Sequence, residues 1–326
     1  MIRLWIVSPT YMDVPSFLVL RNDVLDAIAA TAELAACEPH FLLIDDTAGR
    51  DSDIEKVRDF NDTRVIEPPF NLGHQRAIVY GLRKLAPEIA DDDLIVTLDS
   101  DGQDRAEDVP RLIAPILNGS PRDRTVALAR RTSREESLGF KLAYLGFRVV
   151  FRALTGNVVR SGNFAAYRGI VGKQLLQHPY FDLCYSSTFV ALDTPIEYVP
   201  CPRGPRYEGE SRMTSASLIQ HGFRMMMPFI DRIAVRALAL LAIATGIGVV
   251  LLATVFGIKL FTDAAIPGWA TYATIGALLV SLVALSSAVI LFATFSQSRG
   301  ISLSNLDREP YGPPRESPQR PNRPPR

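Results

Sequence analysis

Two long apolar runs in the C-terminal third constrain the fold of this chain more than any other feature. They extend over roughly Ile233–Phe256 and Trp269–Phe295. A helix needs about 20 consecutive apolar residues to cross a bilayer, and both runs reach that length. The first run contains one charged residue, Arg236, near its start, and the second contains none. The short linker Gly257–Gly268 therefore predicts a transmembrane hairpin rather than two buried helices of a soluble core.

Basic residues flank this hairpin on one side. Five arginines lie before or at the start of the first run and after the second: Arg224, Arg232, Arg236, Arg299 and Arg308. The linker carries only Lys259, balanced by Asp263. Lys and Arg accumulate on the cytoplasmic side of membrane proteins. We therefore expect an integral protein of the inner or plasma membrane, with the preceding domain and both termini in the cytoplasm.

The apolar runs divide the chain into four expected segments. Residues 1–213 mix charged and apolar residues and predict a cytoplasmic globular domain. Residues 214–232 predict a juxtamembrane amphipathic helix, which either lies in the membrane interface or packs on the globular domain. Residues 233–295 form the hairpin. Residues 296–326 are rich in Pro and Arg and predict a disordered tail.

Composition excludes several classes of function. The formal net charge is zero, so there is no whole-chain argument for nucleic-acid binding, which needs a basic surface. The three cysteines, Cys37, Cys184 and Cys201, show no pair spacing, which argues against a disulfide framework or a zinc site. The four histidines, His40, His74, His178 and His221, have no ligand spacing either, and we interpret them as structural or surface residues.

The first 130 residues alternate strand-like and helix-like segments, which predicts an α/β domain. Expected strands are Leu4–Ser8, His40–Ile44, Arg64–Glu67, Leu94–Leu98 and Val126–Ala129. Expected helices are Phe17–Ala36, Gly73–Leu85 and Glu107–Leu117. Such alternation indicates a mostly parallel sheet with helices on both faces. Ligands of these sheets bind beyond the carboxyl ends of the strands.

Polar residues gather where three of the expected strands end. They are Ser8–Asp13, Asp45–Asp46 and Asp99–Asp104. The Asp99-Ser100-Asp101 sequence is the most informative, because two carboxylates two residues apart after a buried strand can reach one cation. Mg²⁺ and Mn²⁺ prefer oxygen ligands and bridge to substrate phosphates. A solvated turn is the alternative for this pattern taken alone.

Several motifs occur in an order that resembles one family. They are VSPTYMD (Val7–Asp13), LLIDDT (Leu42–Thr47), NLGHQRA (Asn71–Ala77), VTLDSDGQD (Val96–Asp104), RSGNFAAYR (Arg160–Arg168) and RGPRYEGESRM (Arg203–Met213). Together with the two-helix anchor, they resemble the inverting family 2 glycosyltransferases with a GT-A, Rossmann-like fold. The subgroup they most resemble is that of the dolichol-phosphate-mannose-synthase-like, polyprenyl-phosphate glycosyltransferases.

The resemblance implies a nucleotide-sugar donor site. Pro9, Tyr11 and Asp13 would line the nucleotide pocket, Asp45 or Asp46 would hydrogen-bond the base, and Asn71, Gly73 and Arg76 would lie near the nucleotide or its ribose. Asp99 and Asp101 would hold Mg²⁺ or Mn²⁺ on the diphosphate, with Gln103 beside them. We accordingly take Asp101, Gln103 and Arg206 as the catalytic candidates.

The resemblance also implies an acceptor site close to the membrane. Its candidates are Asn163, Arg203, Ser211 and Arg212. Many relatives carry Asp at the position of Asn163, and an amide cannot act as a general base; Asp182 is a possible substitute. A lipid phosphate is already ionised near neutral pH and needs no base. We therefore expect a polyprenyl-phosphate acceptor. Transfer to a lipid-linked or surface glycan and a non-catalytic membrane scaffold are the alternatives.

The candidate residues also have structural interpretations that the sequence leaves open. Asp13 and the pair Asp45–Asp46 are compatible with plain turns, Gly73 with a helix start, Arg76 with a surface charge, and Arg203–Arg212 with a segment near anionic lipid. Arg130, Arg131 and Arg134 are expected in a loop after the last strand, where they either clamp phosphate or are solvated. Whether the chain forms a homo-oligomer stays open too.

Overall fold

A seven-stranded sheet forms the centre of the described part of the chain. The computed structural model describes residues 2–119, 124–131, 138–158, 161–182, 184–192, 194–208, 215–262 and 268–297. The strands are β1 (Ile2–Thr10), β2 (Cys37–Asp45), β3 (Thr63–Ile66), β4 (Leu94–Thr97), β5 (Val126–Arg131), β6 (Ser161–Arg168) and β7 (Ile196–Cys201). Their spatial order is β3-β2-β1-β4-β6-β5-β7.

The pairing of the central strands brings their carboxyl ends to one edge. β1 is parallel to β2 and to β4, with Ile6 opposite Phe41 on one side and Val96 on the other. β6 is antiparallel to β4 and β5, and Thr97 pairs with Ala165. Because β6 runs in the opposite direction, its first residues lie beside the last residues of β4. Asn163 therefore reaches the same edge as Asp99.

Helices cover both faces of the sheet. α1 (Val14–Ala29), α2 (Glu55–Arg58) and α4 (Val109–Asn118) cover one face, with the short helices η1 (Ala32–Leu34), η2 (Ser52–Ile54) and η3 (Ala106–Asp108). α3 (His74–Leu85), α6 (Gly169–Leu176), α7 (Tyr185–Ala191) and η4 (Pro179–Asp182) cover the other face. Alternate residues of β1 enter the two cores: Leu4 and Ile6 on one face, Trp5 and Val7 on the other.

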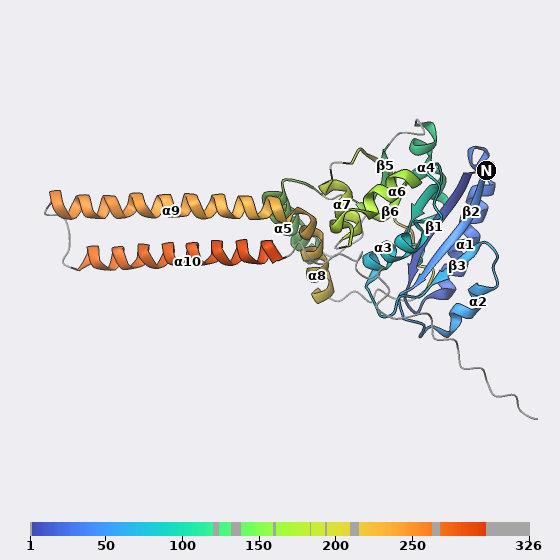
Figure 1. Ribbon diagram of the computed structural model, residues 1–326, viewed down its shortest axis with the longest axis horizontal. Helices are drawn as coiled ribbons and strands as arrows, with labels where there is room; N and C mark the ends of the chain where they lie inside the picture. The colour runs from blue at the N-terminus through green and yellow to red at the C-terminus, as the bar shows by residue number, and fades with distance from the viewer. Residues whose placement is uncertain are drawn as a thin grey trace, which may run out of the picture.

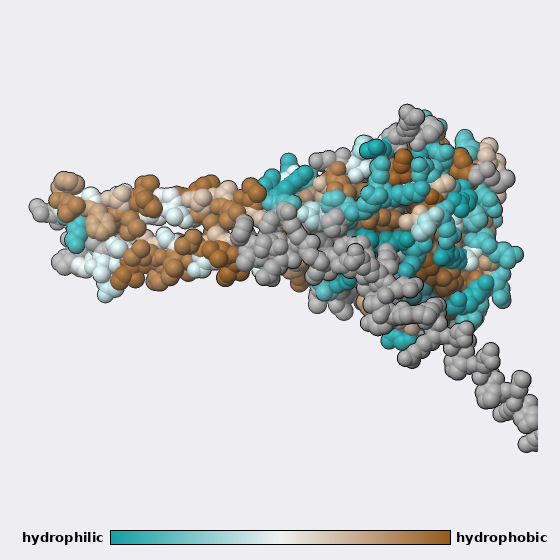
Figure 2. Space-filling model, in the orientation of Figure 1, coloured by the Kyte–Doolittle hydropathy of each residue, from teal (hydrophilic) through white to brown (hydrophobic). Residues whose placement is uncertain are grey.

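Two long apolar helices extend away from the sheet as a hairpin (Figure 1). α9 (Ile230–Phe261) and α10 (Trp269–Gln297) lie side by side, and both expose mostly apolar side chains (Figure 2). Their apolar segments have mean hydropathies of 2.5 and 2.2, and by length and composition alone they are able to cross a membrane. α5 (Leu138–Thr155), α8 (Ser215–Met226) and η5 (Met227–Phe229) lie where the hairpin meets the sheet domain (Figure 1).

This architecture confirms the predicted fold class of a mostly parallel α/β sheet followed by two long apolar helices. Some boundaries were predicted wrongly. The first helix ends at Ala29 and is followed by the separate short helix η1, and α9 continues into the expected linker Gly257–Gly268 as far as Phe261. β5 is not the last strand, since β6 and β7 follow it, and Arg130 and Arg131 belong to β5 itself. Arg134 lies outside the described residues.

Gly169, at the start of α6, provides a test of this packing. Its amide donates to Asp93 O at 2.7 Å, and an added Cβ would lie 2.0 Å from the backbone oxygen of Ala90. Gly169→Ala should therefore destabilise the protein by about 1–3 kcal/mol. Gly146, on α5, has nothing within 4 Å of an added Cβ, so Gly146→Ala should be neutral or slightly stabilising. Thermal unfolding in detergent micelles compares the two, and equal melting temperatures would contradict the prediction.

Candidate active site

The candidate site is built on the loop that follows β4. Asp99 Oδ1 lies 2.7 Å from His74 Nε2 and accepts a hydrogen bond of 3.3 Å from the Asn163 amide nitrogen. Among the described residues both contacts fall on Oδ1, which leaves Oδ2 for a further ligand. α3 positions His74 in its first turn, and β6 positions Asn163.

Charge balance fixes the ionisation of Asp99. Burial favours the neutral acid, but the adjacent His74, the charge of Arg131 and the Asn163 hydrogen bond outweigh it and hold the pKa of Asp99 well below its usual range. For His74, burial opposes protonation, while Asp99 and the nearby carboxylates of Asp101 and Asp104 raise its pKa. The site therefore holds an ionised carboxylate beside an imidazole that is biased towards its protonated form.

Asp101 is the second carboxylate of the loop. Its Oδ1 accepts from the Gln103 amide at 3.0 Å, and its Oδ2 pairs with Arg206 at 2.9 Å. Burial and the neighbouring Asp99 charge raise the pKa of Asp101. Two carboxylates that repel each other in this way attract cations, and here the available cations are His74 and Arg206. The predicted proximity of Asp99, Asp101, Gln103 and Arg206 is thus present.

Asp104 holds the loop in place through one hydrogen bond and one ion pair. One of its oxygens accepts from the Asp99 amide at 3.2 Å, and the other pairs with Arg131 at 3.3 Å. Burial and the charge of Asp99 raise the pKa of Asp104 to about 7. Arg131, left open as a phosphate clamp or a solvated residue, therefore serves in this conformation as a partner of the loop carboxylates.

Residues 202–208 lie across the same loop. The Gly204 amide donates to Gln103 O and the Tyr207 amide to Asp101 O, both at 3.0 Å. Arg203 also donates to the side-chain oxygen of Gln103. Gly102 adopts a φ of +83°, and an added Cβ would lie 2.7 Å from the Tyr207 ring. This segment carries Arg203 and Arg206 to the site. Ser211 and Arg212, expected beside them, lie outside the described residues.

Asp45 and Asp46, at the end of β2, hold neighbouring loops. Asp45 Oδ1 accepts from the backbone and hydroxyl of Thr47 at 3.0 and 2.6 Å. Asp46 accepts from the amides of Leu72 and Gly73 at 2.7 and 2.9 Å, which fixes the start of α3. Both carboxylates are buried. These contacts match the turn interpretation, and contact with a nucleobase stays a prediction.

The other residues expected to bind the nucleotide-sugar donor lie around this edge of the sheet. The Pro9 carbonyl accepts from the Ser100 hydroxyl at 3.2 Å, Tyr11 is exposed, and Asp13 begins α1 without a side-chain capping bond. Asn71 is exposed and Gly73 directly precedes α3. Arg76 Nε has no hydrogen-bond partner within the described chain. Their nucleotide contacts also stay predictions.

A buried polar network behind Asn163 was missed by the sequence analysis. Gln75 donates to Asn163 Oδ1 at 2.9 Å and to Ser186 at 3.1 Å, and the Cys184 thiol donates to Gln75 Oε1 at 2.8 Å. These bonds turn the Asn163 nitrogen towards Asp99. The NLGHQRA motif contains both His74 and Gln75, and it was the sequence feature from which this network could have been predicted.

The structure adds one contact at this site and removes one alternative. His74, interpreted from the sequence as a structural or surface residue, is 41% exposed, and its ring contacts Asp99. Asp182 does not replace a base at Asn163, since it is buried and paired at 2.7 Å with Arg83. Arg83 follows His74 by nine residues on α3, which is about 13 Å along the helix axis.

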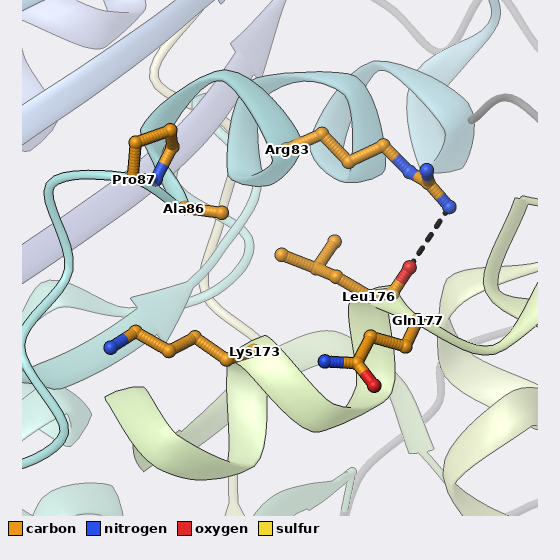
Figure 3. A pocket seen from close by; sticks show the side chains of 6 residues that line it. All are labelled: Arg83, Ala86, Pro87, Lys173, Leu176 and Gln177. Carbon is orange, nitrogen blue, oxygen red and sulfur yellow. Dashed lines mark hydrogen bonds between the residues drawn. The ribbon is translucent and has the colours of Figure 1, made fainter. Parts of the chain in front are cut away.

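A shallow depression of about 390 Å³ lies at that distant end of α3 (Figure 3). Arg83, Ala86 and Pro87 line it from one side, and Lys173, Leu176 and Gln177 from α6 and the residue after it. Arg83 is held by the Leu176 carbonyl and Lys173 by Asp91, at 3.0 and 2.7 Å. This depression is separate from the strand-end site, and its charges are already paired.

A comparison with protein-family sequence models shows the family of this chain. The sequence model of glycosyl transferase family 2 matches residues 6–169, half of the chain. The chain belongs to glycosyl transferase family 2. The matched region runs from β1 to the start of α6 and therefore includes Asp99, Asp101 and Asn163. The expected GT-A glycosyltransferase fold is confirmed; the subgroup stays a prediction.

Solved structures that resemble this glycosyltransferase do so distantly. A mycobacterial protein is 20% identical with a TM-score of 0.45, and the alignment covers 71% of this chain and 74% of that one. Mannosyl-3-phosphoglycerate synthase from Rubrobacter xylanophilus is 14% identical with a TM-score of 0.44 and the same two coverages, 71% and 74%. S. aureus TarS 1-349 is 14% identical with a TM-score of 0.39, at 73% and 66% coverage. Comparison with curated proteins finds no significant match.

A substitution of Gly102 tests how the 202–208 segment is held on the loop that follows β4. Gly102→Ala should cost at least about 1–2 kcal/mol, because Ala is strained at positive φ and its Cβ meets the Tyr207 ring. Amide hydrogen exchange at Gly204 and Tyr207 should speed up. Gly49→Ala is the matched control, since Gly49 also has a positive φ of +75° but its Cβ would meet only the end of Glu67. Equal exchange in both variants would refute the packing argument.

Proposed function

We propose that this chain is a membrane-anchored inverting glycosyltransferase that moves a sugar from a UDP- or GDP-sugar to a polyprenyl phosphate on the cytoplasmic face of a membrane. Three lines support the proposal: the family, the carboxylate loop of Asp99 and Asp101, and the apolar hairpin that begins at α9. Arginines flank this hairpin on both sides in the sequence, which supports a cytoplasmic location for the catalytic domain.

The oxygen ligands that the loop offers fit a divalent cation. No group of three or more His, Cys, Asp or Glu side chains in the described residues has metal-binding geometry. Asp99 and Asp101 instead offer two carboxylates next to cationic side chains, and Mg²⁺ commonly takes one or two protein carboxylates plus substrate phosphates. When bound there, the cation would supply positive charge that stabilises the departing diphosphate. Arg206 can complement that charge, because it already lies on Asp101.

The observation that carries the acceptor proposal is the amide of Asn163. Its nitrogen donates to Asp99, its oxygen accepts from Gln75, and its side chain is buried. The group next to the carboxylate loop therefore orients Asp99 and has no basicity with which to deprotonate an alcohol. A phosphate acceptor needs no such base, since one or both of its ionisable oxygens are already charged near pH 7. Arg203, brought beside Gln103, is a suitable cation for it.

Transfer of labelled sugar from a panel of UDP- and GDP-sugars to purified polyprenyl phosphate tests this function. We expect product only with Mg²⁺ or Mn²⁺, and we expect Asp101→Asn to lower turnover at least about a hundredfold through the lost metal interaction. Asp53→Asn, an exposed carboxylate paired with Lys56, is the control and should stay active. Donor turnover that ignores the lipid phosphate would favour a glycan acceptor. No turnover with any donor would favour the non-catalytic scaffold.

Gln75 tests the orienting role of Asn163. Gln75→Leu removes the donor to Asn163 Oδ1, and we expect the Mn²⁺ concentration for half-maximal activity to rise roughly 10–100-fold, as for other outer partners of metal ligands. Gln75→Glu should be worse than Gln75→Leu, because an acceptor at this position turns the Asn163 oxygen towards Asp99. Gln174→Leu, on the exposed side of α6, is the matched control. If Glu and Leu at position 75 behave alike, the amide orientation is irrelevant.

A further inference from the structure

Exposed apolar side chains gather on α5, α8 and the short helix η5 at the base of the hairpin. We call this set the collar: Leu145, Val149 and Val150 on α5, Ile219 and Phe223 on α8, and Met227 on η5. Each is between 44% and 63% exposed. Elsewhere in the described sheet domain, the exposed large apolar side chains are Tyr11, Met12, Val19 and Phe70. The concentration at the junction therefore differs from the scattered apolar exposure that is normal on soluble surfaces.

The collar residues follow helical spacing. Leu145 and Val149 are four residues apart on α5, and Ile219, Phe223 and Met227 repeat at the same interval. Residues four apart lie on one face of a helix. Arg148 and Arg152 are exposed beside the α5 stripe. An apolar stripe bordered by arginine is the composition of helices that lie in the membrane interface.

Other residues of the two helices pack against each other and against η5. Phe151 of α5 packs on Phe229 with ring centroids 5.5 Å apart, and Phe147 lies 3.0 Å from the position of an added Cβ at Gly222 of α8. These contacts of α5 with α8 and η5 therefore use residues other than those of the collar. The collar side chains stay exposed although the helices that carry them are packed together.

Arg236 ties α5 to the hairpin. Its guanidinium donates to the carbonyls of Ala153 and Arg152 at 2.6 and 3.3 Å, which caps the C-terminal end of α5. Gly156, with a φ of +79°, makes room for it, since an added Cβ would lie 2.6 Å from the Arg236 side chain. The end of α5 is thus held at the level of the second turn of α9.

The length of α9 places that level in a bilayer. From Arg236 to Phe261 the helix advances about 37 Å, whereas the hydrocarbon core is about 30 Å thick. A hairpin that crosses the core therefore leaves Arg236, and the end of α5 capped by it, near the headgroups. The arginines beside the collar match anionic headgroups in charge.

We propose that α5 and α8 lie together in the interfacial layer of the bilayer that the hairpin crosses, with the collar in contact with lipid. The inference rests on the proposed membrane anchoring and adds α5, part of the globular domain, to the membrane-bound surface. α8 packs close to the candidate site, since the Arg224 guanidinium lies 3.4 Å from the position of an added Cβ at Gly73. The collar therefore holds the start of α3 and the catalytic loop next to the membrane surface.

Fluorescent labels in the full-length protein test this placement. Single cysteines replace Val149, Phe223, Val19 or Leu251 in a Cys37→Ser background, in which the two remaining cysteines are buried. Each variant is labelled with an environment-sensitive fluorophore and reconstituted in vesicles of phosphatidylcholine and phosphatidylglycerol. Val149→Cys and Phe223→Cys should be quenched severalfold more by lipids with a shallow nitroxide than Val19→Cys, the exposed control on α1. Leu251→Cys, within α9, should respond to a deep nitroxide.

The outcomes distinguish a failure of the collar proposal from a failure of the proposed membrane anchoring. If iodide in the buffer quenches labels at positions 149 and 223 as strongly as the label at position 19, the collar does not contact lipid and the proposal is overturned. Quenching of position 251 by the deep nitroxide would in that case still support the membrane anchoring. A blue-shifted label that neither quencher reaches would also overturn the collar proposal, since protein rather than lipid would then cover the face. An aqueous label at position 251 would overturn the anchoring and the collar with it.

Discussion

The parallel pairing of β1 with β2 and β4 is the constraint on which the site depends. It brings three strand ends to one edge, so that the loops after Thr10, Asp45 and Thr97 meet. The antiparallel entry of β6 adds Asn163 to that edge from the other direction. None of these residues is near the others in sequence. The topology therefore creates the site, and the loop chemistry then decides what it can bind.

Charge neutralisation is the second constraint, and it explains why the loops have the contacts they have. Asp99, Asp101 and Asp104 are within six residues and partly or fully buried, so each needs a compensating partner. His74, Arg206 and Arg131 provide one cation to each. They come from α3, the 202–208 segment and β5. The carboxylate loop therefore links three other parts of the chain, and a ligand that replaced one of these cations would alter the contacts of the others.

The sequence predicted local features well and long-range contacts poorly, for a physical reason. Strand periodicity and terminal polarity located β1, β2 and β4 and the Asp99–Asp101 loop, because alternation and burial are local properties. β6 and β7 were not predicted. The contact of His74 with Asp99 and the pairing of Asp182 with Arg83 were not predicted either. A side chain's partner depends on which strands and helices are neighbours, and neither residue carries a local mark of its partner.

A series of side-chain contacts connects the hairpin with the candidate site, and no single sequence motif indicates it. Arg236, near the start of the apolar helix α9, is exposed and donates to carbonyls at the C-terminal end of α5, where a cation is favourable. Through Phe151 and Phe229 that helix packs at the base of α9, and through Phe147 it contacts α8. α8 in turn reaches Gly73, where Asp46 fixes the first turn of α3 and thereby the position of His74 on Asp99. A series of packed contacts therefore runs from the base of α9 through α5 and α8 to the start of α3, whose first turn places His74 on Asp99.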